Sequence, residues 1–296
     1  MTAMNVGIRT AFLLGLSVLW SAASHGAEPA GAEFNEEVVK QDRIYHSRGA
    51  QTATGYTVDR ALLIYADGLA SGFERALADL GPADRWLDIG AGEGQAVLDY
   101  YTPGYDLAHP QGRERRGRKA QAVAISIEDR RTRLWDLSAG TLEPNQIQYL
   151  FGRRMSQYSL EELGKFQLIT DVIGGFSYTD GLSRFMEKVL GLLDVNGSFY
   201  TALQDVQWED GSNRPFYPGA PFLTRIIDAA GADMKVCAWL KRIACVEVTC
   251  EAKPQWQPPL EAFHVRKVCN EVAVPAVETV HYQAGTPPER RFQLRQ

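Results

Sequence analysis

The sequence predicts an α/β fold: a doubly wound, mostly parallel seven-stranded sheet with an antiparallel last strand and helices on both faces. Strand and helix patterns alternate between residues 85 and 231, which is typical of right-handed βαβ units in a parallel sheet. Two further strand patterns, residues 234–243 and 245–252, follow with a tight connection, so we expect them to pair antiparallel. The first strand also runs into a glycine-rich loop, the usual ligand contact of such a sheet.

Each element is expected from its own residue pattern. A helix capped by Thr57 and ended by Gly81-Pro82 is expected because its apolar residues recur every three or four positions. Ser159 and Glu162 form a capping-box pattern, which predicts a short helical turn. The predicted strands are residues 85–90, 120–127, 147–151, 166–174 and 198–203, and the predicted helices between them are residues 95–101, 130–137, 182–193 and 220–231.

Length and composition indicate one large domain or a domain with an appendage. The chain has 296 residues, of which 45% are hydrophobic and 23% charged. The net charge is −5, so no global basic field favours nucleic acid. The predicted organisation is a signal peptide at residues 1–27, a polar segment at 28–56, the main domain at 57–252, and a C-terminal tail packing on that domain at 253–296.

Residues 1–27 have the pattern of a secretory signal peptide. Arg9 is the only charged residue before an apolar run, and small residues follow that run. The run is shorter than the ~20 residues that span a bilayer as a helix. We therefore expect export to the periplasm. The alternative is an uncleaved N-terminal helix that remains as a membrane anchor.

The four cysteines all lie in the C-terminal quarter of the chain. They form no C-x-x-C pair, so a metal site is not expected. If residues 236–243 and 245–251 form a hairpin, Cys237 and Cys250 lie opposite each other and a disulfide is feasible in an oxidising compartment. The alternative is buried thiols that act as small hydrophobic side chains.

The loop after the first predicted strand has a glycine at every second position. These glycines are Gly90, Gly92 and Gly94, and Asp88 lies two residues before the first of them. Glycines allow backbone conformations that other residues resist, and they let a ligand approach the chain closely. A dinucleotide site expects the spacing G-x-G-x-x-G, whereas position 95 is Gln95. The spacing therefore disfavours a dinucleotide ligand.

The stretch "LDIGAGEG" resembles the first motif of class I (Rossmann-like) S-adenosylmethionine-dependent methyltransferases, here an exported bacterial-type member. The stretch "KFQLITDVIGGFSYTDGLSRFMEKVLGLLDVNGSFYTAL" and the two closing strands resemble later parts of the same family, so that the resemblance covers roughly residues 45–252. It implies S-adenosylmethionine as the cofactor and methyl transfer to an acceptor, with a small molecule favoured. No Asn/Asp-Pro-Pro-Tyr motif is present, so a nucleic-acid acceptor is not expected.

The resemblance also implies roles for individual residues. Glu128, with Ser126 as the alternative, would bind the ribose hydroxyls, since one acid is expected there at the end of the second strand. Where the family often has an acid for adenine, this sequence has Arg153, and adenine would be held by backbone and by Met155 or Tyr158. The loop that would line the amino-acid and ribose portions comprises Asp88, Gly90, Ala91, Gly92 and Gly94.

Asp171 ends the fourth predicted strand and is the first candidate for a catalytic base or a residue that positions the acceptor. The alternative for Asp171 is an acid that caps the loop or contacts the cofactor. Tyr178 and His46 are the next candidates. Four aromatic residues between the fifth strand and the next helix would line an acceptor pocket or pack internally: Trp208, Phe216, Tyr217 and Phe222.

Two further features bear on partners and activity. The Arg113–Lys119 loop is strongly basic, which indicates an anionic partner or a solvated loop. S-adenosylmethionine is a cytosolic metabolite, so export would require a cofactor supply outside the cytosol. Two alternatives to a methyltransferase therefore stay open: a catalytically degenerate member that binds a small ligand, and an NAD(P)-dependent oxidoreductase. The sequence indicates no oligomeric state.

Overall fold

The computed structural model describes residues 60–101, 119–127, 129–179, 181–204, 222–256, 260–284 and 290–294. Within these ranges no helix has both the length and the apolar character that a membrane-crossing helix needs. Several predicted features lie outside the described residues: the signal peptide and the polar segment up to residue 56 with His46, the Arg113–Lys119 loop except Lys119, Glu128, Trp208, Phe216 and Tyr217.

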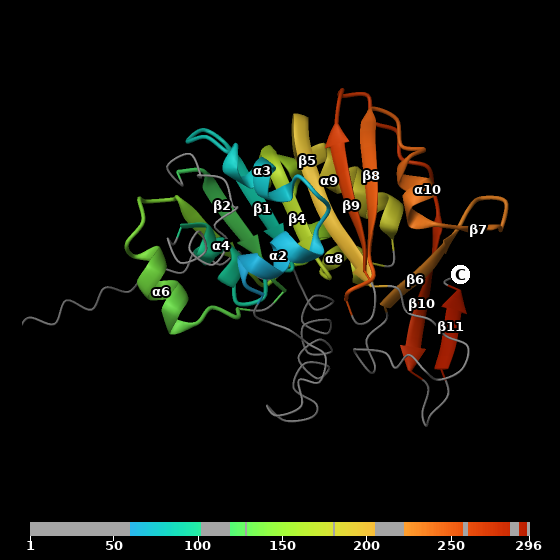
Figure 1. Ribbon diagram of the computed structural model, residues 1–296, viewed down its shortest axis with the longest axis horizontal. Coiled ribbons are helices and arrows are strands. Elements are labelled where there is room, and N and C mark those ends of the chain that lie inside the picture. Colours follow the sequence, from blue (N-terminus) through green and yellow to red (C-terminus); the bar gives the residue numbers. More distant parts are fainter. Residues whose placement is uncertain are drawn as a thin grey trace, which may run out of the picture.

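The main sheet has seven strands in the order β3-β2-β1-β4-β5-β9-β8 (Figure 1). Strands β1 to β5 are parallel, and β9 runs antiparallel to both of its neighbours, β5 and β8. This arrangement confirms the predicted fold class. The strands are β1 Arg85–Ile89, β2 Gln121–Ile125, β3 Ile147–Leu150, β4 Phe166–Val172, β5 Leu193–Gln204, β8 Val246–Lys253 and β9 Leu260–Lys267.

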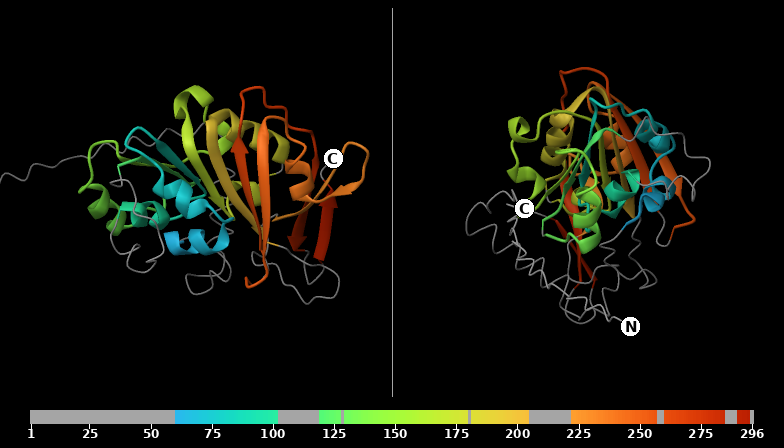
Figure 2. Two further views of the ribbon diagram at one scale, coloured as in Figure 1. Left: turned by 45° about the horizontal axis from the view of Figure 1, so that its top comes forward. Right: turned by 90° about the vertical axis from the view of Figure 1, so that its left-hand side faces the viewer.

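Helices cover both faces of this sheet. Figure 2 shows α2 and α3 on one face and α9 on the other. The central strands are mostly apolar and are buried on both faces, as expected where helices cover a parallel sheet. The helices are α2 Leu62–Gly68, α3 Phe73–Ala78, α4 Gln95–Tyr101, α6 Arg133–Ala139, α7 Leu160–Leu163, α8 Gly175–Tyr178, α9 Leu182–Leu192 and α10 Val236–Leu240, with a short 3-10 turn at Met155–Gln157. The predicted capping box of Ser159 and Glu162 is present at α7.

The single helix predicted to run from Thr57 to Gly81 is wrong in the described part, because the chain forms two short helices, α2 and α3. Gly72 lies between them with φ +94°, a left-handed conformation that cannot continue a right-handed helix. The backbone N–H of Ser71 donates to Glu251 Oε1 at 2.8 Å. The break therefore ties the first helices to β8.

Two other predicted elements are corrected. Residues 234–243 do not form a strand: they contain α10, whose residues Val236, Trp239 and Leu240 are buried at helical spacing. The antiparallel partner of β8 is instead β9, which lies beyond residue 252. The predicted helix at 220–231 is also wrong, since it contains strand β6 Phe222–Ile227, a run rich in β-branched residues that favour strands.

Strand β6 belongs to a second, antiparallel sheet in the order β11-β10-β6-β7. Figure 1 shows this sheet beside α10, at the β8 end of the main sheet. Trp239 in α10 donates from Nε1 to the carbonyl of Pro275 at 2.8 Å, and so connects α10 to the segment that leads into β10. The remaining strands are β7 Asp233–Met234, β10 Glu278–Ala284 and β11 Arg290–Leu294.

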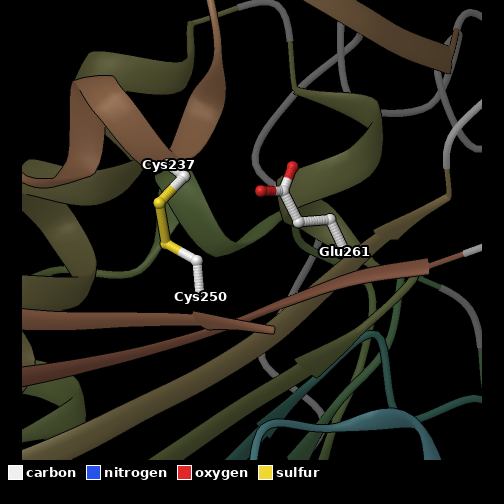
Figure 3. Close-up of side chains that lie close together, drawn as sticks. All are labelled: Cys237, Cys250 and Glu261. Carbon is white, nitrogen blue, oxygen red and sulfur yellow. A yellow bond between two sulfur atoms is a disulfide. The ribbon is translucent and has the colours of Figure 1, made fainter. Parts of the chain in front are cut away.

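All four cysteines of the sequence form disulfides. Cys237 of α10 pairs with Cys250 of β8 at a Cα–Cα distance of 6.1 Å, so the bridge that was feasible from the sequence is present, but it joins a helix to a strand and not the two strands of the expected hairpin (Figure 3). The second bridge joins Cys245 to Cys269 at 5.0 Å, across the ends of β8 and β9. Glu261 lies beside the first bridge in Figure 3, but both sulfurs are bonded to each other and are not free to bind a metal.

Candidate functional site

The glycine-rich loop joins β1 to α4 and lies at the carboxyl end of β1. Gly90, Gly92 and Gly94 have φ values of +72°, +58° and +80°, so all three occupy the left-handed region. The backbone N–H groups of Gly90 and Ala91 both donate to the carbonyl of Ile125, at 2.9 and 3.0 Å. The structure therefore brings the predicted loop residues together and ties them to the end of β2.

Close contacts within the protein explain why two of these positions are glycine. A Cβ atom on Gly90 would lie 2.9 Å from the Cα of Gly174 in the loop after β4. A Cβ atom on Gly94 would lie 2.7 Å from Cε3 of Trp135 in α6. Neither position accommodates a side chain even when no ligand is bound. The close approach predicted for a ligand is thus, at Gly90 and Gly94, a close approach of the chain to itself.

Asp88 is fully buried beneath this loop and accepts hydrogen bonds from two hydroxyl groups. Tyr65 of α2 donates to both carboxylate oxygens, at 2.9 and 3.1 Å, and Thr170 donates to Oδ1 at 2.7 Å. Trp86 Nε1 donates in turn to the Thr170 hydroxyl at 2.8 Å. Burial raises the pKa of Asp88 to about 7, and the two hydroxyl donors oppose that rise.

Three residues of this network were missed by sequence reasoning: Tyr65, Trp86 and Thr170. In the sequence, Tyr65 is one of the apolar residues that recur every three or four positions in the first predicted helix. A hydroxyl group on such a face was the one available signal, because a buried tyrosine usually finds a hydrogen-bond partner. Nothing in the sequence indicates that this partner is Asp88, 23 residues away.

Asp171 is the penultimate residue of β4 and lies beside Ile89 of β1 in the sheet. Its carboxylate is fully buried and accepts the backbone N–H groups of Gly174 and Phe176, each at 2.9 Å. Burial raises the pKa of Asp171 to about 7, and the charge of Asp88 adds to that rise. Between these contacts, Ile173 has φ +52°, a strained value for a β-branched residue. Asp171 therefore holds the tight turn that packs against Gly90.

The loops after β2 and β3 contain the residues predicted for ribose and adenine. Ser126 is half-buried, and its backbone N–H donates to the carbonyl of Leu150 at 2.9 Å. Arg153 forms an ion pair with Glu162, and its guanidinium lies 4.0 Å from the ring centroid of Tyr158. Met155 and Tyr158 are buried. Arg153 and Tyr158 thus hold the β3 loop together in this structure.

The two buried carboxyl groups lead to a pH-dependent stability. A pKa raised from 3.8 to about 7 means that the folded chain binds a proton that the unfolded chain releases. The contribution of this bound proton to the free energy of unfolding is complete below about pH 4, and it is lost as the pH rises through about 7. We expect the free energy of unfolding of Asp88→Asn, relative to wild type, to increase between pH 5 and pH 8, as measured by urea denaturation.

The matched control is Asp79→Asn, which removes an exposed carboxylate at the end of α3. Over the same pH range it measures how the stability responds to the loss of an exposed carboxylate. A difference for Asp88→Asn that stays constant between pH 5 and pH 8 would show that Asp88 does not titrate in this window.

Comparison with known proteins gives likeness in structure only. No family model matches the chain, and no curated protein matches it. A 1,6-didemethyltoxoflavin-N1-methyltransferase from Burkholderia thailandensis, solved with S-adenosylhomocysteine, is 16% identical with a TM-score of 0.46 over 82% of this chain and 93% of its own. The glycopeptide N-methyltransferase MtfA, complexed with sinefungin, is 12% identical with a TM-score of 0.42 over 82% and 100%.

An rRNA methylase from Streptococcus thermophilus is 13% identical with a TM-score of 0.41, over 72% of this chain and 100% of its own. These sequence identities are too low for the substrate or the activity of these proteins to be assigned to this chain. The strand order of the main sheet, with β9 antiparallel between β5 and β8, is itself the order typical of Rossmann-like methyltransferases.

Proposed function

We propose that this chain, which has the class I methyltransferase fold, binds S-adenosylmethionine at the Gly90–Gly94 loop and transfers its methyl group to a small-molecule acceptor. One observation carries the proposal: three left-handed glycines, two residues apart, follow a buried acid at the end of β1. Strand β1 lies between β2 and β4, where the strand order reverses, and ligands of open α/β sheets bind at that point.

The roles of the residues follow from their positions. The backbone around Gly92 would contact the amino-acid and ribose portions of the cofactor. Asp88 would act from beneath the loop, because its carboxylate is fully buried and bonded to Tyr65 and Thr170. Ser126, the residue directly after β2, is the alternative contact for the ribose, and Glu128 lies outside the described residues.

The bound cofactor would supply a methyl group already activated by its sulfonium. The protein then mainly has to align the acceptor with that methyl group and to exclude water. Asp171 contributes to this alignment by fixing the backbone of the loop after β4, since both of its carboxylate oxygens already accept hydrogen bonds from backbone N–H groups. It orders the turn that would face the acceptor, and in this arrangement it is a positioning residue and not a base.

Calorimetric titration of the full chain with S-adenosylmethionine, S-adenosylhomocysteine and NAD⁺ tests this proposal. We expect both adenosyl compounds to bind and NAD⁺ not to bind. Failure of both adenosyl compounds to bind would refute the proposal, and binding of NAD⁺ alone would favour an oxidoreductase. Adenosyl binding without any release of S-adenosylhomocysteine, over a broad panel of small acceptors, would instead favour a ligand-binding protein without catalysis.

We also propose that the chain is exported. The signal-peptide pattern of residues 1–27 supports export, and so do the two disulfides, which use every cysteine of the sequence. Disulfides persist mainly in oxidising compartments such as the periplasm. Sequencing the N-terminus of the mature protein from fractionated cells should give a first residue between 24 and 28. An intact N-terminus in a membrane fraction would favour the uncleaved anchor.

A further inference from the structure

Tyr149 of β3 contacts the glycine-rich loop from two strands away. Its hydroxyl donates a hydrogen bond to the backbone carbonyl of Gly92 and accepts one from the backbone N–H of Arg130 at 3.3 Å. The side chain of Ser126 is also hydrogen-bonded to Tyr149. The ring is buried, with 7% of its surface exposed. One hydroxyl group thus links the loop after β1 to the loop after β2.

Trp135 of α6 supports the same loop two residues further on. Its ring lies against Gly94, where no Cβ atom fits. It also packs edge-on against Tyr149, with ring centroids 5.1 Å apart and an interplanar angle of 74°. Both aromatic side chains are nearly inaccessible to solvent. Together they support the loop at Gly92 and at Gly94.

A hydrogen bond to the Gly92 carbonyl orients a whole peptide unit. The peptide bond is planar and trans, so the carbonyl of Gly92 and the N–H of Glu93 point in opposite directions. Gly92 has φ +58° and no side chain of its own, so few local forces select one orientation of this unit. The bond from Tyr149 supplies that selection before a ligand arrives.

We propose that Tyr149 is a positioning residue that holds the glycine-rich loop in its ligand-binding shape. This inference rests on the proposed function as far as the identity of the ligand is concerned. Pre-organising a binding loop increases affinity, because the loop does not have to be ordered when the ligand binds. Ser126 takes part in the same link, since its side chain is hydrogen-bonded to Tyr149.

The test compares Tyr149→Phe with Tyr101→Phe. Tyr101 is a matched control because its hydroxyl also donates to backbone carbonyls, those of Ala120 at 2.7 Å and Gln146 at 3.0 Å, but at the far end of α4. In the ligand-free full chain, we expect Tyr149→Phe to accelerate amide hydrogen exchange in a peptide covering residues 90–98. Tyr101→Phe should leave that peptide unchanged.

The second measurement is calorimetric titration with S-adenosylhomocysteine. Loss of one supporting hydrogen bond should raise the dissociation constant of Tyr149→Phe about tenfold, and that of Tyr101→Phe less than twofold. Unchanged exchange in residues 90–98 of Tyr149→Phe would overturn the inference, whatever ligand the protein binds. Faster exchange with unchanged affinity would also overturn it. A wild-type chain that binds no adenosyl compound would instead refute the proposed function, because the exchange measurement needs no ligand.

Discussion

Replacing Gly92 by valine should abolish binding of S-adenosylhomocysteine, with a loss of affinity of at least about 100-fold. Gly92 has φ +58°, which a β-branched residue adopts only with strain of about 1–2 kcal/mol. The larger part of the effect should come from the new side chain, which would occupy the space of a ligand lying on the loop backbone. Calorimetric titration measures the loss, and circular dichroism with thermal unfolding measures how far the fold is kept.

Gly231→Val is the control that separates strain from loss of contact. Gly231 has φ +80°, and nothing lies within 4 Å of a Cβ atom built there. It should therefore lose a similar amount of stability while its affinity for S-adenosylhomocysteine stays that of wild type. An unchanged affinity in Gly92→Val would show that the ligand does not lie on this loop, and it would refute the site assignment.

Removing either disulfide should lower the free energy of unfolding by about 3 kcal/mol, from the loss of a cross-link in the unfolded chain. The bridges have sequence separations of 13 and 24 residues: the first holds α10 to β8, and the second joins the ends of β8 and β9. The variants are Cys237→Ala with Cys250→Ala, and Cys245→Ala with Cys269→Ala. Urea denaturation of each pair under oxidising conditions measures the effect.

The variant that lacks all four cysteines is the control for the reductant. Adding a reductant should destabilise the wild-type chain and leave this variant unchanged. The reductant is added at urea concentrations that unfold the chain, so that both disulfides are accessible to it. If the urea midpoint of the wild-type chain is the same with and without reductant, the bridges are absent from the protein as it is made. That result would also remove one of the two supports for export.

The local residue pattern was sufficient to predict the type and the range of an element where that element is buried and lies between two turns. The strands β1 to β4 and the helices α4 and α9 lie within the predicted ranges, because a short apolar run between turn residues has few alternatives in a parallel sheet. It was insufficient for residues 220–243, where the apolar spacing fits either a helix or a strand. There the tertiary partners decide: β6 pairs with β10, whose paired residues lie 51 to 60 positions later in the chain, and α10 is tied to β8 by a disulfide.

The sequence by itself determined the glycine spacing, the acid two residues before it and the alternation that produces a doubly wound sheet. All three features can be read from short stretches of the sequence. The glycines, for example, stand where the backbone needs φ above zero, and that need selects glycine position by position. Only the tertiary structure decided that Tyr65 bonds to Asp88, that Asp171 binds the turn after β4, and that Tyr149 reaches the Gly92 carbonyl. These contacts join residues from different strands and helices, and such residues meet only after strand order and register have been set by packing of the whole sheet.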